Sequence, residues 1–138
     1  MEARVLAEKL EDIRADLALA MPTRVVTRDF LDFAQRSQVD LEAGTLTIIT
    51  QRESRYANYR GREADLGRMT LAAVGQLKLP EDAFPSTVED AEFAFAEEVK
   101  DWLQGVLPVN LIDLIETRFS GQMDAPYGWF AMTWEVLP

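Results

Sequence analysis

The side chains with the most obvious chemical potential are carboxylates gathered between residues 81 and 101. Glu97 and Asp101 would lie one turn apart on a helix, a spacing that a metal or acid–base site could use. No other ligand type converges on them, so we interpret the run as a solvated helix face, favoured by the positive N-terminal end of the helix. Lys100 is the only local cation, and the acidic residues are Glu81, Asp82, Glu89, Asp90, Glu92, Glu97, Glu98 and Asp101.

Cysteine and histidine are both absent from the sequence. Disulfides, thiolate metal sites, cysteine nucleophiles and histidine acid–base catalysis are therefore excluded. The sequence also lacks a glycine-rich phosphate loop, a nucleophile elbow and zinc-ligand spacing. Ser86 is better interpreted as a helix cap than as a nucleophile. We expect a protein that is not an enzyme and that uses no metal or cofactor.

The overall charge bears on possible partners. The 138 residues carry a net charge of −10, and their number suits a single domain spanning residues 1–138. Such an acidic surface disfavours sequence-specific nucleic-acid binding. The chain begins with a charged helical pattern instead of a signal sequence, and no apolar run approaches the roughly 20 residues of a membrane span. We expect synthesis in the cytosol and no membrane partner.

Hydrophobic periodicity predicts the elements that must position these residues. Two helices are expected, at Ala3–Met21 and from the capping-box pattern at Ser86 to Gly105. Residues 28–43 receive no assignment, and Leu111–Ile115 fits either a helical turn or a strand. The predicted strands are Thr23–Thr27, Gly44–Gln51, Arg68–Leu79, Thr117–Asp124 and Trp129–Val136. This order favours an α+β fold, with a mixed or antiparallel sheet of about four to five strands and the two main helices packed on one face.

Two features indicate protein contacts. The first is a long loop, 52–67, that collects Arg52, Arg55, Tyr56, Tyr59, Arg60 and Arg62. Arginine and tyrosine are enriched at interface hot spots, although a loop without a partner or a contact with an anion or nucleic acid would look similar. The second feature is a set of apolar residues that fall off the buried stripes, namely Val5, Leu19, Phe93 and Trp129. Neighbouring molecules, a second sheet layer or a local cluster would each bury such residues.

The chain resembles the tail-terminator (tail-completion) proteins of long-tailed phages, of which the lambda minor tail protein is the familiar type. The resemblance lies in the size and order of segments along nearly the whole chain. An opening helix (ARVLAEKLEDIRADLALAMP) precedes the strand GTLTIITQ, and LAAVGQLKLP leads into the acidic helix PSTVEDAEFAFAEEVKDWL. The final strand is YGWFAMTWEV.

The resemblance implies a virion protein of the tail neck, assembled in the host cytoplasm. It implies a homo-oligomer, a six-membered ring, on the head-proximal end of the tail tube. Such a ring ends polymerisation of the tube protein and presents a surface to the head-completion or connector protein. An acidic lumen would let DNA pass without binding. Another neck protein (a stopper or adaptor), a small non-viral binding domain and a carboxylate-dependent enzyme are the alternatives.

Overall fold

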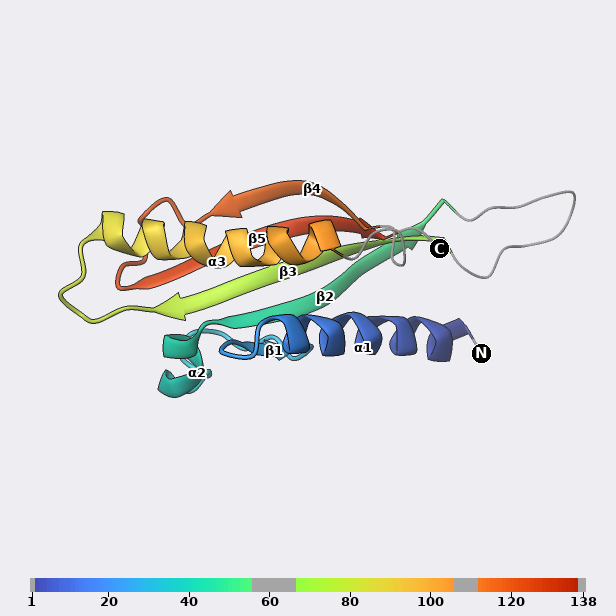
Figure 1. Cartoon of the computed structure of the whole chain (residues 1–138), viewed down its shortest axis with the longest axis horizontal. Coiled ribbons are helices and arrows are strands. Elements are labelled where there is room, and N and C mark those ends of the chain that lie inside the picture. Colours follow the sequence, from blue (N-terminus) through green and yellow to red (C-terminus); the bar gives the residue numbers. More distant parts are fainter. Residues whose placement is uncertain (1, 56–66, 106–111, 137–138) are drawn as a thin grey trace, which may run out of the picture.

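The computed structural model describes residues 2–55, 67–105 and 112–136, and only the backbone of residues 2–5. It contains three helices and five strands within these ranges (Figure 1). In chain order they are α1 (Glu2–Ala20), β1 (Val25–Thr27), α2 (Gln38–Ala43), β2 (Thr45–Ser54), β3 (Arg68–Lys78), α3 (Pro85–Gly105), β4 (Ile112–Phe119) and β5 (Tyr127–Val136).

The strands form one mixed sheet in the order β1-β2-β3-β5-β4. β1 runs parallel to β2, and every other neighbouring pair is antiparallel. The long helices α1 and α3 lie side by side on one face of this sheet (Figure 1). The structure therefore confirms the predicted α+β class, with five strands and two main helices on one face.

The core lies between the two long helices and the first face of the sheet. Alternate residues of each strand point to it, so that Ile48, Ala73 and Met132 are neighbours across three strands. The helices contribute the predicted apolar stripes, Leu10, Ile13 and Leu17 from α1 and Val88, Phe95, Val99 and Trp102 from α3. Aromatic pairs join the layers, because Phe95 meets Phe130 edge to face at 5.0 Å and Trp102 stacks on Trp134 at 5.7 Å.

The hairpin of β2 and β3 is longer than its predicted strands. Arg52, Glu53 and Ser54 were expected in the loop, but they continue the pairing with β3 after a bulge between Thr50 and Arg52. This pairing provides hydrogen-bond partners for their backbone groups. The segment is polar, so it has no alternation of apolar residues that would predict a strand. The connection to β3 therefore begins at Arg55, and its residues 56–66 lie outside the described residues.

The unassigned stretch 28–43 contains the short helix α2. The Ser37 side chain accepts a hydrogen bond from the Asp40 backbone N–H at the start of α2, and Gly44 ends it with φ of 87°. A helix of 6 residues is too short to show a helical period in the sequence.

The last two strands differ from their predicted bounds. Of the two options for residues 111–115, the strand is correct from Ile112 onward, and β4 ends at Phe119 instead of Asp124. The turn is longer than expected. It comprises Ser120–Pro126, and β5 begins at Tyr127. Turn residues such as Gly121, whose φ is 69°, cannot continue a strand.

The capping box predicted at Ser86 is wrong. The backbone N–H groups of Thr87 and Val88 donate to the Phe84 carbonyl at 2.9 and 3.2 Å, so α3 begins at Pro85 and Ser86 lies within its first turn. Proline suits the first helical position because its missing N–H would have no partner there.

Candidate protein-interaction surface

The second face of the sheet, opposite α1 and α3, carries small and apolar residues over its central strands. The register places Ala72 between Ile49 and Thr133. In the next row of that face, Val74 lies between Thr47 and Ala131. Only part of this face is covered by other residues of the described chain, since Ile49, Ala72, Val74 and Ala131 are half-buried.

Residues 28–36, which we call the strap, cover one part of this second face. Gln76 of β3 donates from Nε2 to the Leu31 carbonyl at 3.0 Å, and Phe33 lies 5.0 Å from the Tyr127 ring. Within the strap, Arg36 Nη2 donates to the Asp29 carbonyl at 2.8 Å. Three polar residues of the second face are buried, namely Thr45, Thr47 and Gln76, and Thr45 Oγ1 donates to the Asp40 carbonyl of α2 at 3.0 Å.

A groove of about 670 Å³ lies between the strap and the uncovered part of the second face. Small residues form its floor and larger side chains its walls, and it is lined by Phe30, Asp32, Phe33, Ala34, Ile49, Gln51, Ala72, Val74, Gln76, Trp129 and Ala131. Its volume lies within the range of about 300–1,000 Å³ that is usual for binding pockets. An apolar lining of this kind binds apolar groups by removing them from water.

A buried carboxylate positions Trp129 at this groove. Glu92 of α3 is 0% exposed, and its Oε2 accepts hydrogen bonds from Ser120 Oγ at 2.5 Å and from the Trp129 backbone N–H at 3.1 Å. The indole Nε1–H of Trp129 donates to Asp124 Oδ2 at 2.9 Å. Burial raises the pKa of Glu92, against the lowering effect of its hydrogen bonds.

The assignment of Glu92 to a solvated helix face is therefore wrong. The sequence did hold a signal for its burial. Val88 lies four residues before Glu92 and Phe95 three residues after it, so all three occupy one stripe of α3. An acid inside an apolar stripe is buried where the fold provides donors for it.

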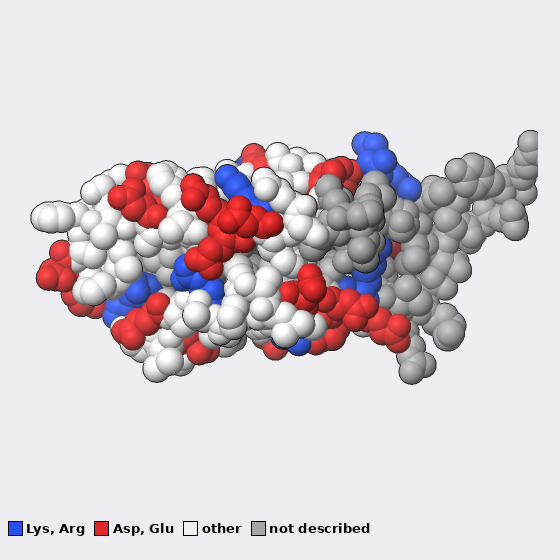
Figure 2. Space-filling view, viewed as in Figure 1, with Lys and Arg blue, Asp and Glu red and all other residues white. Residues whose placement is uncertain are grey.

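Three other acids of α3 are exposed or ion-paired. Glu97 and Asp101 are exposed. Glu98 makes an ion pair with Arg24 at 2.5 Å, and the Arg24 guanidinium also lies 4.3 Å from the centre of the Phe95 ring. Among the described residues, no group of three or more acidic side chains could hold a metal ion. Acidic side chains outnumber basic ones on the face that carries the helices (Figure 2).

The predicted apolar interface residues that the structure describes lie on different elements. Leu19 of α1 is 81% exposed and Phe93 of α3 is 40% exposed, although Phe93 also meets Phe119 edge to face at 5.0 Å. Trp129 lies off the buried face of its strand, as predicted, on the opposite face of the sheet from Trp134, and it lines the groove.

The basic residues of the predicted loop are only partly described. Arg52 belongs to β2, where its Nε donates to Thr70 Oγ1 at 3.4 Å, and Arg55 is exposed. Tyr56, Tyr59, Arg60 and Arg62 and the side chain of Val5 lie outside the described residues. The sequence analysis did not predict a role for Phe30 and Phe33, which lie in the unassigned stretch. The available signal was the presence of two phenylalanines three residues apart in a short polar segment.

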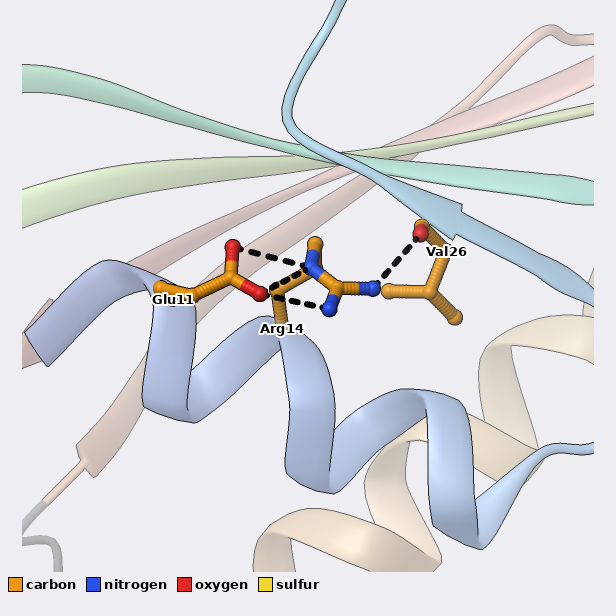
Figure 3. A network of polar contacts seen from close by, with 3 residues as sticks. All are labelled: Glu11, Arg14 and Val26. Carbon is orange, nitrogen blue, oxygen red and sulfur yellow. Dashed lines mark hydrogen bonds and ion pairs between the residues drawn. The ribbon is translucent and has the colours of Figure 1, made fainter. Parts of the chain in front are cut away.

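The two edges of the sheet differ in their protection. β1 has 3 residues, and Arg14 of α1 donates from Nη1 to the Val26 carbonyl at 3.4 Å (Figure 3). Glu11 holds this guanidinium through contacts of 2.5–3.0 Å, and the hydrogen bond between them lowers the pKa of Glu11. β4, at the other edge, has 8 residues and a bulge between Leu114 and Glu116. An exposed edge of that length is a template for another strand.

No helix in the described parts of the chain is long and apolar enough to cross a membrane. The chain matches no protein-family model, and its sequence matches no curated protein.

Proposed function

We propose that this protein is a structural component of a phage virion, a tail terminator that acts through contacts with its own copies and with neighbouring proteins. Six copies close a ring on the head-proximal end of the tail tube. The ring ends polymerisation of the tube protein and offers its outer surface to the head-completion or connector protein. Its place is the neck region of the tail, after assembly in the host cytoplasm.

The observation that carries this proposal is the second face of the sheet. The long helices α1 and α3 cover the first face, while the second face keeps an apolar groove lined by Phe33, Val74, Trp129 and their neighbours. A contiguous apolar surface of this kind on a small domain is typical of a protein interface. The small residues of its floor let a partner approach the sheet closely.

Two further features support the proposal. The α+β fold has the order of helices and strands on which the resemblance to tail terminators rests. Exposed apolar residues also stand on other elements, with Leu19 81% and Ile115 58% exposed. Different patches on one subunit allow head-to-tail contacts, which close into rings when the rotation between subunits permits it.

Measuring the oligomeric mass of the purified protein by light scattering and native mass spectrometry tests the assembly. The capping role is tested by polymerising the tube protein encoded in the same genome, with and without this chain, and measuring tube lengths by negative-stain microscopy. We expect a six-copy ring and tubes that stop growing when the chain is added. A chain that remains monomeric on tubes and leaves their length unchanged would refute the proposal.

A matched pair of substitutions connects the groove with assembly. Ala72→Glu places a carboxylate on the groove floor, whereas Ala7→Glu makes the same change on the exposed surface of α1. The half-buried position lets the monomer direct the new carboxylate to water, so both variants should fold. We expect Ala72→Glu to abolish ring formation and Ala7→Glu to preserve it, as measured by light scattering.

Phe93→Ser tests the helix side of the subunit. Phe93 is 40% exposed, and its edge-to-face pair with Phe119 adds about 0.5–1.5 kcal/mol beyond the area that it buries, so the variant should remain folded. We expect it to weaken assembly in a sizing experiment. An unchanged oligomer would show that Phe93 is not an interface anchor.

A further inference from the structure

The β4 edge is the open edge of this sheet. The opposite edge is short, and Arg14 already occupies the Val26 carbonyl there. The 8 residues of β4 pair only with β5 on one side, and among the described residues no strand pairs with the other side. Unpaired backbone N–H and carbonyl groups on such an edge are a template for an extended partner, because a strand presents donors and acceptors at the matching spacing.

The register identifies which N–H groups point outward. The Ser120 N–H donates to the Trp129 carbonyl at 3.1 Å, which continues the antiparallel pairing of β4 with β5. Along an antiparallel edge strand, the backbone groups of alternate residues point toward the partner strand. The N–H and carbonyl of Arg118 therefore point to β5, as those of Ser120 do. Thr117 and Phe119 therefore direct their N–H and carbonyl groups to the open side.

The surface beside this edge is both apolar and acidic. A groove of about 300 Å³ runs between α3 and β4, lined by Lys100, Leu103, Gln104, Ile112 and Leu114. Further along, Phe93 and Phe119 form an aromatic pair. Glu89 and Glu97 lie four residues before and after Phe93, on the same side of α3. The edge thus suits an extended segment that carries aromatic side chains and arginines.

We propose that residues 55–62 of a second copy bind along the β4 edge, between β4 and the Glu89–Glu97 side of α3. This segment contains Arg55, Arg60, Arg62 and two tyrosines, in a chain whose net charge is −10. The positive charge of this segment is attracted to the acidic side of α3 in the copy that it binds. Its tyrosines pack against the Phe93–Phe119 pair of that copy. The inference rests on the proposed ring, for which it supplies a head-to-tail contact, because segment and edge are different parts of each subunit.

A fluorescent peptide with the sequence of residues 54–63 tests this contact directly. Its anisotropy is measured while the full-length protein is added at low salt. We expect binding that weakens at least about tenfold, or about 1.4 kcal/mol, for Glu89→Arg/Glu97→Arg. Asp12→Arg/Glu42→Arg makes the same charge change at exposed positions of α1 and α2 and should change the affinity less than about twofold.

Thr117→Pro tests the strand pairing itself. Proline removes an outward N–H without removing a hydrogen bond to β5, so the sheet should form and the peptide should again bind at least about tenfold more weakly. Circular dichroism checks the fold. If this variant unfolds, the charge-reversed pair, whose substitutions lie on the surface of α3, decides alone.

Mixing two assembly-deficient variants tests the head-to-tail geometry. Thr117→Pro has a defective β4 edge and an intact segment 55–62. Arg55→Glu/Arg60→Glu/Arg62→Glu has an intact β4 edge and a segment with reversed charge. We expect each to be monomeric alone and a one-to-one mixture to form a heterodimer. A peptide that does not bind, or that binds all variants equally, overturns the inference even if rings form. Rings that use this contact but never stop tube growth overturn the proposed function and leave the inference intact.

Discussion

Replacing Glu92 by glutamine removes the one fully buried carboxylate among the described residues while keeping its shape. In the wild type, Oε2 accepts both hydrogen bonds, from Ser120 Oγ and the Trp129 N–H, and Oε1 has no partner. A glutamine oxygen at the Oε2 position accepts the same two bonds, and the amide NH₂ takes the place of Oε1. The substitution therefore changes the charge more than the contacts.

The sign of the pH effect follows from the direction of the pKa shift. Burial raises the pKa of Glu92 in the folded protein above the ordinary value of about 4.3. The folded state then binds this proton more tightly than the unfolded chain. The resulting stabilisation is complete below the ordinary pKa and is lost as pH rises through the raised one.

The expected magnitude is a slope. Between the two pKa values, the free energy of unfolding of the wild type should fall relative to that of Glu92→Gln by up to about 1.4 kcal/mol per pH unit. Above the raised pKa the difference becomes constant. Glu92→Ala should be much worse at every pH, because it leaves the buried Ser120 hydroxyl and the half-buried Trp129 N–H without this acceptor, and a buried donor without a partner costs about 1–3 kcal/mol.

Urea unfolding followed by tryptophan fluorescence at a series of pH values from about 4 to 8 measures these differences. Glu97→Gln is the matched control, since it removes an exposed carboxylate from the same helix. Parallel pH profiles for the wild type and Glu92→Gln would refute the reasoning. They would mean that the carboxylate has the same proton affinity in the folded and unfolded chains.

Two other substitutions test the packing of the sheet and the protection of its edge. Gly75→Ala would place a Cβ 2.1 Å from Cε2 of the buried Phe130 ring, so we expect an overpacking cost of about 1–3 kcal/mol in urea unfolding, with Ala72→Gly as a control on the other face of β3. Arg14→Ala frees the Val26 carbonyl on the β1 edge; we expect faster aggregation by light scattering than for Arg28→Ala, and equal rates would contradict the capping role.

Much of the fold could be predicted because its signals are local. The apolar stripes of α1 and α3 repeat with the helical period, and β3 and β5 alternate with period two, so the sequence identified the two long helices, most strands and the outward face of Trp129. The failures were local conflicts. Ser86 matched a capping pattern one residue inside a helix that begins at Pro85, and α2 was too short to show a period.

The candidate site depended on contacts that no local pattern specifies. Val74 and Trp129 are 55 residues apart in the chain, and the strap reaches the same groove from residues 30–34. The sequence placed Trp129 on the outer face of its strand but gave no sign of the strap that walls the groove. The burial of Glu92 likewise required Ser120 and Trp129 to approach α3 from another part of the chain.

The sequence by itself determined the α+β class, the two amphipathic helices and the absence of cysteine and histidine chemistry, because composition and short-range periodicity are properties of neighbouring residues. Only the tertiary structure decided which acid is buried, which face of the sheet stays uncovered and which edge remains open. These properties depend on strand order and register, and the order β1-β2-β3-β5-β4 joins residues that are distant in the chain.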